Sequence, residues 1–325
     1  MNKFESFLAP QLEQYIIYRH RLGYSKTSSL SHLKSFDRYL KQHQPEKASL
    51  QPSFFMELRA DLKIEPRSIN RIMASVRVFF NYLVREGSYT QNPVKDIPYL
   101  PENDIMPFIF SPEQVNHLLS AVSNRIRKVS KRKYLKDLSG YMAIVLLARC
   151  GLRISEPLRL RLNHYRFDEK TIYIEKTKFK KERLIPMPRA VAVDLENYLP
   201  VRRALLGNVV NNYLLANYAG RGLNDDRVRL VFDRAVRDIG LDQPRQIIGN
   251  LNISSPTPHS LRHAFAVNTL KSVKERGKSA QNALPVLAAY MGHSEYKHTI
   301  KYLKVIDAQQ RLGLVNFVRT QPDQS

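Results

Sequence analysis

Residues 257–266 read Thr-Pro-His-Ser-Leu-Arg-His-Ala-Phe-Ala, and the rest of the chain can be interpreted outward from this segment. Thr257 and the proline after it predict the start of a helix, because a hydroxyl caps the first turn and proline fits the first helical position. His259 and Arg262 are three residues apart, so both project from one face of that helix. His263 has the spacing from His259 that zinc helices use, but no glutamate, nearby carboxylate or thiolate completes a metal site.

A second segment, residues 290–303, reads Tyr-Met-Gly-His-Ser-Glu-Tyr-Lys-His-Thr-Ile-Lys-Tyr-Leu. Gly292 permits a tight turn, His293 follows it, and Tyr302 lies nine residues further on. The chain contains 17 tyrosines. One tyrosine is therefore uninformative by itself, and an ordinary amphipathic helix would account for it equally well.

A third segment, residues 148–156, reads Ala-Arg-Cys-Gly-Leu-Arg-Ile-Ser-Glu. The apolar run Tyr141–Cys150 leads into it, is too short to cross a bilayer, and predicts a buried helix with the single cysteine packed at its end. Gly151 predicts the end of this helix, and Ser155 or a neighbour is expected to cap the next one. Arg153 would then lie near a helix N-terminus, where its guanidinium and free backbone N–H groups can bind one phosphate. A surface arginine would fit the same residues.

Between these segments the pattern changes from helical to extended. Residues 171–175 alternate as a strand, residues 176–182 are rich in lysine, and residues 183–186 predict a returning strand. The turn of such a hairpin can place one ammonium group in a cleft as a proton donor or phosphate ligand. An exposed basic turn is the simpler interpretation of this segment taken alone.

Together and in this order, the segments resemble the tyrosine recombinase family of integrases and bacterial chromosome-dimer resolvases. The family's Gly-Leu-Arg-x-Ser-Glu box matches residues 151–156, and its His-x-x-Arg box followed by histidine matches residues 259–263. Its Gly-His-Ser segment, with a tyrosine nine residues after the histidine, matches residues 292–302. The resemblance covers essentially the whole chain, because the family also has a helical DNA-gripping domain ahead of the catalytic one.

The family's hairpin lysine lies three residues before a Lys-Glu-Arg triplet, which here is residues 181–183. This spacing selects Lys178, with Lys176 and Lys180 as alternatives. The chain departs from the family pattern at Pro157, where an aliphatic residue is usual, and at residues 295–298, where small residues or threonine are common. Residues 271–281 look longer than in the family, and a surface insertion is expected there.

The resemblance implies a metal-free strand transfer that needs no cofactor and no ATP. Two arginines would stabilise the charge on the phosphate in the transition state, and His293 would add a hydrogen bond. His259 would donate a hydrogen bond or act in acid–base catalysis, the tyrosine would form a 3′-phosphotyrosyl link, and the lysine would protonate the 5′-oxygen. Glu156 and His263 would orient their neighbours. The expected catalytic residues are Arg153, Lys178, His259, Arg262, His293 and Tyr302.

The net charge of the chain favours a polyanionic partner. Lys and Arg number 52 against 29 Asp and Glu, for a charge of +23 and an isoelectric point near 10.1. The excess is +6 over residues 1–100 and +17 over residues 101–325. A field over both halves suits nucleic acid held from two sides better than it suits solubility alone or an anionic membrane surface. The single cysteine excludes an internal disulfide and a Cys-rich zinc site.

Periodicity and proline content predict a mainly α fold with a small β-hairpin. Residues 1–92 show apolar spacings of three and four, as expected for a helical core-DNA-binding domain built as a four- or five-helix bundle. Residues 93–107 form a Pro-rich linker, and residues 108–325 form the mostly helical catalytic domain. Ser111, Pro112 and Gln114 predict a capped helix start. We expect helices to about Leu162 and again after the hairpin, with breaks at Gly240 and Pro256.

The expected partner is double-stranded DNA with a specific core site, bound by a homotetramer on two duplexes as in the family. Accessory recombinases or DNA-bending proteins are further possible partners, no membrane is involved, and the expected location is the cytoplasm, with nucleoid association on DNA. The residues 307–318 are amphipathic and suit docking on a neighbouring protomer or on their own domain equally. The candidate DNA-binding residues are Arg127, Lys128, Lys131, Arg132, Lys176, Lys180 and Lys181.

We interpret the chain as a site-specific recombinase or integrase that acts for a mobile genetic element, in integration or in transposition. A type IB topoisomerase-like enzyme would share the Arg, Lys, His and Tyr set, and supercoil relaxation on DNA without a recombination site would reveal it. A non-catalytic DNA-binding protein would keep the basic surface but has no need for the tyrosine. A metal-dependent nuclease would require paired carboxylates, which are missing near these segments.

Overall fold

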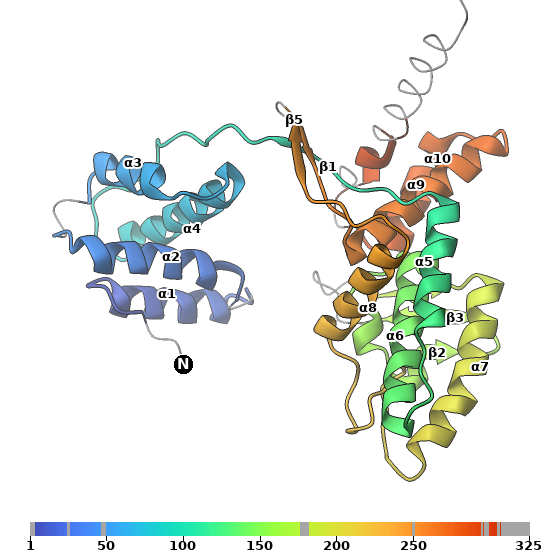
Figure 1. The fold of residues 1–325 in the computed structure, drawn as a ribbon. Helices are drawn as coiled ribbons and strands as arrows, with labels where there is room; N and C mark the ends of the chain where they lie inside the picture. The colour runs from blue at the N-terminus through green and yellow to red at the C-terminus, as the bar shows by residue number, and fades with distance from the viewer. Residues whose placement is uncertain are drawn as a thin grey trace, which may run out of the picture. The chain divides into compact units, whose positions relative to one another are not determined.

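The chain folds into two compact units, which divide after Asp104 (Figure 1). The computed structural model describes residues 4–24, 27–46, 50–175, 182–248, 251–293, 295, 299–303 and 306. The mainly helical fold with small sheets that the sequence predicts is confirmed. No helix of these described residues is both long and apolar enough to span a membrane.

The first unit is a small helical bundle. Its helices in the described residues are α1 (Ala9–Arg21), α2 (Thr27–His43), α3 (Pro52–Asp61) and α4 (Pro66–Arg85). Helix α4 begins at Pro66, because proline lacks only an N–H that the first turn leaves unbonded. Phe55 and Phe80 pack edge to face with ring centroids 5.3 Å apart, and Phe36 lies beside both rings. The aromatic stripe of α4 therefore forms the centre of this core.

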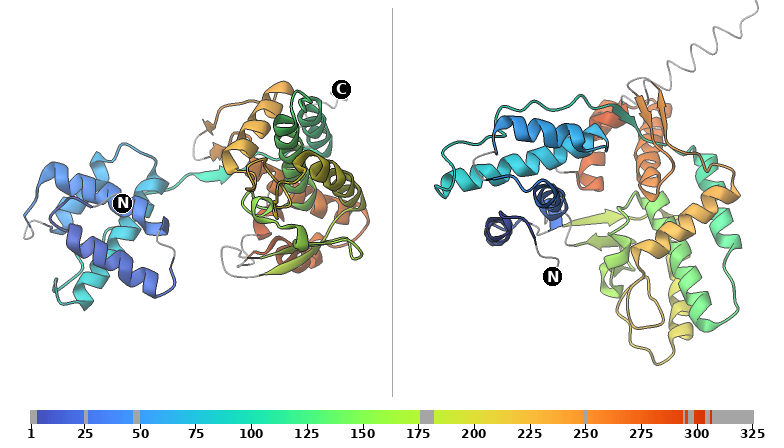
Figure 2. Two further views of the ribbon diagram at one scale, coloured as in Figure 1. Left: turned by 90° about the horizontal axis from the view of Figure 1, so that it is seen from below. Right: turned by 60° about the vertical axis from the view of Figure 1, so that its left-hand side comes forward.

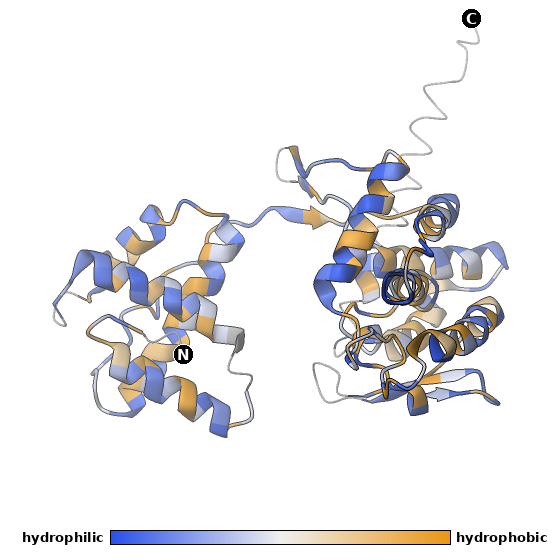
Figure 3. Ribbon diagram, turned by 60° about the horizontal axis from the view of Figure 1, so that its bottom comes forward, coloured by the Kyte–Doolittle hydropathy of each residue, from blue (hydrophilic) through white to orange (hydrophobic). Residues whose placement is uncertain are grey.

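The second unit is built around one apolar helix. Its helices in the described residues are α5 (Pro112–Asn124), α6 (Lys131–Cys150), α7 (Arg189–Leu206), α8 (Asp225–Asp238), α9 (Pro258–Glu275) and α10 (Ala280–Met291). Helix α6 packs against α5, α7, α8 and α9, and its residues from Met142 onward are nearly all buried. A helix that is apolar on every side belongs in a core. The other helices alternate apolar and polar residues along their length (Figure 3).

Two small sheets lie on different sides of this unit (Figure 2). One contains β2 (Tyr165–Arg166), β3 (Thr171–Ile174) and β4 (Arg183–Pro186) in sequential antiparallel order. The other has the order β1-β6-β5, from β1 (Asp104–Met106), β5 (Gln246–Ile248) and β6 (Leu251–Ile253). Strands β3 and β4 confirm the predicted hairpin. Ile174 pairs with Arg183, the last residue of β3 with the first of β4.

Two expectations about secondary structure are wrong. Helix α6 ends at Cys150 as Gly151 predicts, because this glycine adopts a left-handed conformation with φ 59°, but the next helix expected toward Leu162 does not form. Two short 3-10 turns follow, η2 (Pro157–Arg159) and η3 (Leu162–His164). The region after the hairpin is not wholly helical either, since β5 and β6 pair with each other there and β6 also pairs with β1.

We expect Gly151→Ala to lower the free energy of unfolding by about 2–4 kcal/mol, combining backbone strain with overpacking. A Cβ at this position would meet Cδ1 of Phe265 at 2.4 Å, besides being held at a positive φ. Gly277→Ala is the matched control, because Gly277 has φ 73° but no neighbour within 4 Å. Urea unfolding of both variants measures the difference. Equal losses would contradict the close approach of Phe265.

Candidate active site

The turn after α6 places Arg153 beside Gly292, which follows the last residue of α10. The backbone N–H of Arg153 donates to Oε2 of Glu156 (2.9 Å), and its Nη1 donates to Oε1 of the same carboxylate (2.9 Å). Its Nη2 donates to the carbonyl oxygen of Gly292 (2.8 Å). The expected helix N-terminus at Arg153 is wrong, because a 3-10 turn follows and Glu156 occupies the backbone N–H. The Arg153 side chain is 25% exposed, so part of it remains accessible to solvent.

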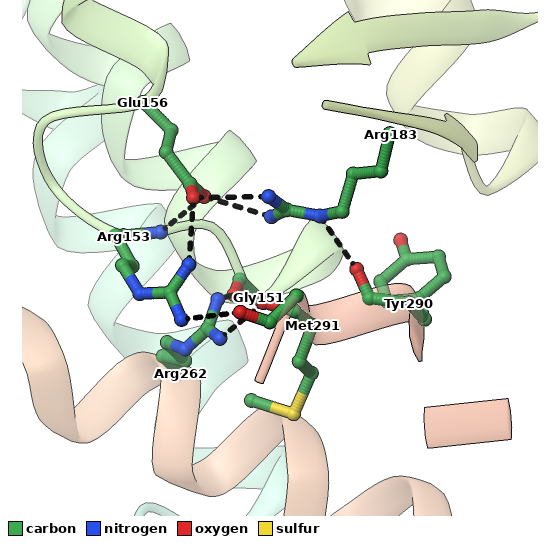
Figure 4. A network of polar contacts seen from close by, with 8 residues as sticks. Gly151, Arg153, Glu156, Arg183, Arg262, Tyr290 and Met291 are labelled. Carbon is green, nitrogen blue, oxygen red and sulfur yellow. Dashed lines mark hydrogen bonds and ion pairs between the residues drawn. The ribbon is translucent and has the colours of Figure 1, made fainter. Parts of the chain in front are cut away.

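Glu156 is shared between two arginines, as Figure 4 shows. Arg183, the first residue of β4, donates from Nη1 to Oε1 (3.1 Å) and from Nη2 to Oε2 (2.9 Å) of this carboxylate. Its Nε donates to the carbonyl oxygen of Tyr290 (2.8 Å). Burial raises the pKa of Glu156, but Arg183, the backbone N–H of Arg153 and the charge of Arg262 together lower it more, so that the net shift is downward. The carboxylate is therefore ionised and bound on both of its oxygens.

Arg262 is the largest fully buried side chain of the described residues, with 1% of its surface exposed. Its Nη1 donates to the carbonyl oxygen of Gly151 (2.6 Å) and its Nη2 to that of Met291 (2.5 Å). These bonds join α9 to the end of α6 and the end of α10 (Figure 4). Burial and the nearby charge of Arg153 lower the pKa of Arg262 to about 9, which leaves the guanidinium charged at neutral pH.

Two histidines lie against the buried tyrosine, and a third lies against one of them. Nδ1 of His263 lies 3.2 Å from the hydroxyl oxygen of Tyr302, which is 4% exposed. The ring of His293 stacks beside Tyr302 at a centroid distance of 6.2 Å, and its Nδ1 lies 2.7 Å from Oγ1 of Thr299. The ring of His259 meets that of His263 nearly at a right angle, 4.5 Å between centroids. The described part of the site therefore brings together the chemistry of segments up to 150 residues apart.

The protein environment keeps two of these histidines neutral at pH 7. Burial and then the charge of Arg262 lower the pKa of His259 to about 4, although part of the residue is exposed. Burial and then His259 lower the pKa of His263 to about 3. Burial raises the pKa of the Tyr302 hydroxyl, while Arg262 and Arg153 act in the opposite direction. A neutral imidazole can accept the hydrogen bond of the tyrosine, and the two arginines favour charge on its oxygen.

The cationic groups of the site stand where a metal-dependent enzyme would place carboxylates. Within the described ranges, no three His, Cys, Asp or Glu side chains are grouped as metal ligands. Glu156, the carboxylate beside the arginines, is bound to Arg153 and Arg183 on both of its oxygens. The donor set suits a phosphate group and does not suit a divalent cation.

Other predicted residues lie elsewhere or outside the described residues. Arg127, Lys128, Lys131 and Arg132 are exposed at and before the start of α6. The helix has 20 residues, so this basic run lies about 30 Å from Gly151 at its other end. Lys176, Lys178, Lys180 and Lys181 lie outside the described residues, as does the amphipathic segment 307–318. The suspected insertion at 271–281 contains the end of α9 and the start of α10.

Arg183 is the main site residue that the sequence did not single out. It served only as a landmark in the Lys-Glu-Arg triplet, and a basic residue at the start of a strand gives no hint of its partner. In the structure Arg183 and Ile185 lie on one face of β4 and the isoleucine is fully buried, but the sequence does not reveal this face, because Leu184 is apolar as well. Thr299, the buried partner of His293, was likewise missed.

We expect the stability of the protein to fall as the pH drops from 6.5 toward 3, partly because of His263. Its folded pKa is below the ordinary value of 6.5. The unfolded chain therefore binds the extra proton in this window, and stability rises with pH there by at most about 1.4 kcal/mol per unit for one proton.

Replacing this imidazole tests the attribution. In urea unfolding at several pH values, His263→Phe should give a shallower acid loss than the wild type between pH 6.5 and 4. His117→Phe, an exposed change on α5, is the control and should follow the wild type. An unchanged slope in His263→Phe would show that other groups cause the acid loss.

The fold and the site together define a class of protein. A chain of two basic units, whose second unit gathers two arginines and three histidines around a buried tyrosine, is typical of enzymes that transfer DNA strands through a tyrosine. The comparisons with known proteins agree with this class.

Residues 109–309 match the phage integrase family. An integrase/recombinase of Sinorhizobium fredii, y4rB, is 28% identical over 294 residues, which cover 90% of this chain and 91% of that protein. The tyrosine recombinase XerC of Alcanivorax borkumensis is 29% identical over 237 residues, 73% of this chain and 68% of that protein. Because the match covers more than half of the chain, this protein belongs to the phage integrase family and is a tyrosine recombinase.

Solved structures share the fold. XerH recombinase bound to a palindromic difH substrate aligns with a TM-score of 0.69 and 18% identity over 91% of this chain and 80% of that chain. The Tn1549 transposon integrase in complex with a circular intermediate DNA aligns with a TM-score of 0.65 and 20% identity, covering 92% of this chain and 95% of that chain. The family match, together with this shared fold, shows that the chain is an enzyme of site-specific DNA recombination.

Proposed function

We propose that Tyr302 is the nucleophile of this recombinase and that Arg153 and Arg262 hold the phosphate it attacks. The observation that carries the proposal is the position of the tyrosine, which lies against His263 at 3.2 Å and within the electrostatic reach of both arginines. A phenol is a weak nucleophile at neutral pH, so positive charge beside its oxygen is what the reaction requires. The Arg153 side chain, 25% exposed, would offer its guanidinium to a non-bridging oxygen.

In this mechanism each remaining group has one task. Tyr302 passes its hydroxyl proton to neutral His263 or to water and attacks the phosphorus, so that a 3′-phosphotyrosyl bond forms as the bond to the 5′-oxygen breaks. Lys178 protonates that leaving oxygen, while His259 and His293 donate hydrogen bonds or exchange protons at the phosphate. A 5′-hydroxyl of a partner strand then attacks the phosphotyrosine, gives its proton back to Lys178, and releases Tyr302, whose oxygen takes up a proton again. Because the covalent bond conserves the phosphodiester energy, neither ATP nor a metal enters the proposal.

We assign residues 1–92 to a core-DNA-binding domain, residues 93–107 to a linker and residues 108–325 to the catalytic domain. The positive charge of both halves supports a duplex held between two domains. The basic run at 127–132, with the lysines at 176, 180 and 181, is proposed to contact the backbone. A tetramer on two duplexes, aided by accessory or DNA-bending proteins, would act for a mobile genetic element in the cytoplasm and on the nucleoid. The likeness to a transposon integrase supports that setting.

The test is a nicked suicide substrate that carries the attachment site recovered from DNA flanking the gene. The protein is incubated with it in chelator, and a denaturing gel separates free DNA from DNA linked to protein. We expect an adduct whose DNA is attached to the peptide containing Tyr302, as mass spectrometry would report. A protein that binds this DNA but forms no adduct would contradict the mechanism and favour binding without catalysis.

A further inference from the structure

We propose that Arg183 is a positioning residue of the recombination site. It would keep Glu156 from cancelling the charge of Arg153, and it would set the geometry of the turn that carries His293. The inference rests on the proposed function, because it assigns Arg183 a role in the chemistry of the same phosphate. It concerns a residue on β4 that has no place in the mechanism given above.

The contacts of Arg183 converge from one strand on two other segments. All three of its nitrogens are used: two bind the carboxylate of Glu156 and the third binds the carbonyl oxygen of Tyr290. The side chains of Arg183 and Glu156 are 10% and 6% exposed, so water competes little for these bonds. Strand β4, the loop after α6 and the end of α10 are thereby held in one arrangement (Figure 4).

The charges show why a second arginine is needed. Arg153 and Glu156 alone would form a neutral pair, and a neutral pair attracts a phosphate weakly. With Arg183 on the same carboxylate, two positive charges face one negative charge, and the cluster keeps a net charge of +1 before Arg262 is added. Arg183 also lowers the pKa of Glu156, which keeps the carboxylate able to hold Arg153. Arg183 therefore supplies the counter-charge, and Arg153 keeps its own charge for the substrate.

The same side chain also restricts the turn before His293. Gly292 closes α10 with φ 63°, and a Cβ on it would come within 2.9 Å of Nη1 of Arg183. On its other side, the carbonyl oxygen of Gly292 accepts the hydrogen bond from Arg153. The turn is thus enclosed by two guanidinium groups, and His293 is the next residue. A shift of Arg183 would displace Arg153 and His293 together.

Only arginine can perform both tasks. A lysine would keep the positive charge beside Glu156 but could not donate in parallel to both oxygens and also reach Tyr290. A glutamine would remove the charge and leave a neutral donor and acceptor. The lysine and glutamine variants therefore separate the charge from the geometry.

The experiment measures single-turnover cleavage of the nicked suicide substrate over a range of protein concentrations. The plateau rate reports the chemical step, the half-saturating concentration reports DNA binding, and the final amplitude reports the active fraction. Each protein is also tested on a substrate whose scissile phosphate is a methylphosphonate, which lacks the negative charge that Arg153 would meet. Arg166→Gln is the control, because Arg166 on β2 of the same sheet forms an exposed ion pair with Glu169.

We expect Arg183→Gln to lower the plateau rate by about 10- to 100-fold with half-saturation unchanged, the range for a misplaced reacting group. The loss should shrink on the methylphosphonate, Arg183→Lys should be intermediate on the ordinary phosphate, and Arg166→Gln should match the wild type. A wild-type rate for Arg183→Gln would overturn the inference. So would a reduced amplitude at the wild-type rate, or equal losses on both substrates, because each indicates a purely structural ion pair.

Two further controls separate this inference from the proposed function. The wild-type protein is tested first, and absence of its adduct would refute the proposed chemistry before Arg183 is considered. If urea unfolding shows that Arg183→Gln is not folded under the assay conditions, Arg183→Lys provides the same comparison of the two substrates. A lysine variant with a wild-type rate and a wild-type response to the methylphosphonate would then overturn the positioning by geometry.

Discussion

Tyr302→Phe should eliminate the covalent DNA adduct and lower strand cleavage at least on the order of 10⁴-fold, as is found when a covalent nucleophile is removed. The reason is chemical, since phenylalanine keeps the ring but has no oxygen to bond to phosphorus. DNA binding should be unchanged, because the hydroxyl is buried and 4% of the residue is exposed. The variant loses one hydrogen bond, to His263, which costs about 1 kcal/mol of stability.

A matched control exists in the same unit. Tyr165 is also 4% exposed, and its hydroxyl donates to Oε1 of Glu196 at 2.9 Å. Tyr165→Phe should lose similar stability but cleave DNA at the wild-type rate. Adduct gels, urea unfolding and DNA-binding titrations on both variants give the comparison. An adduct that persists in Tyr302→Phe would show that another residue is the nucleophile.

Arg262→Gln should lower the cleavage rate by about 10²- to 10³-fold, the loss that follows when one preset charge or donor at a transition state is removed. The arginine is 1% exposed and its two bonded carbonyl oxygens belong to Gly151 and Met291. Losing it removes positive charge from the phosphate site and leaves those carbonyls without their donors. We expect stability to fall by about 1–3 kcal/mol as well.

The stability loss must be separated from the catalytic loss, and Arg202 allows this. It is 5% exposed and its Nη2 donates to the carbonyl oxygens of Asn211 (2.5 Å) and Tyr213 (2.7 Å). Arg202→Gln should therefore destabilise the protein in the same way while its folded molecules cleave at the wild-type rate. Single-turnover rates corrected for active fraction make the test. Equal rates for the two variants would refute a role of Arg262 at the phosphate.

Several local features of the fold could be predicted because they depend on residues close in sequence. Ser111 accepts from the backbone N–H of Gln114 (3.2 Å), whose side chain accepts in return from the N–H of Ser111 (2.9 Å). Thr257 begins α9 with a capping box to Ser260. Caps and hairpin alternation act over two to four residues, so the sequence contains the whole interaction.

The wrong expectations concern positions where local patterns compete. Gly151 ends α6 as predicted, but the further helix expected toward Leu162 is replaced by two 3-10 turns. A capped helix after Arg153 was expected from Ser155, whereas the carboxylate of Glu156 takes the backbone N–H in its place. The strands β5 and β6 were missed because each has only three residues, too few for a periodic pattern.

The sequence by itself determined the mainly helical fold, the hairpin, the basic charge of both halves and the family to which the chain belongs. It also supplied the candidate arginines, histidines and tyrosine, because their order and spacing are properties of the chain alone. The tertiary structure decided which of these groups touch. Glu156 meets Arg183 across 27 residues, Arg262 meets Gly151 across 111, and His263 meets Tyr302 across 39. Such contacts depend on how α6, α9 and α10 pack, and packing is set by the whole core and not by any short segment.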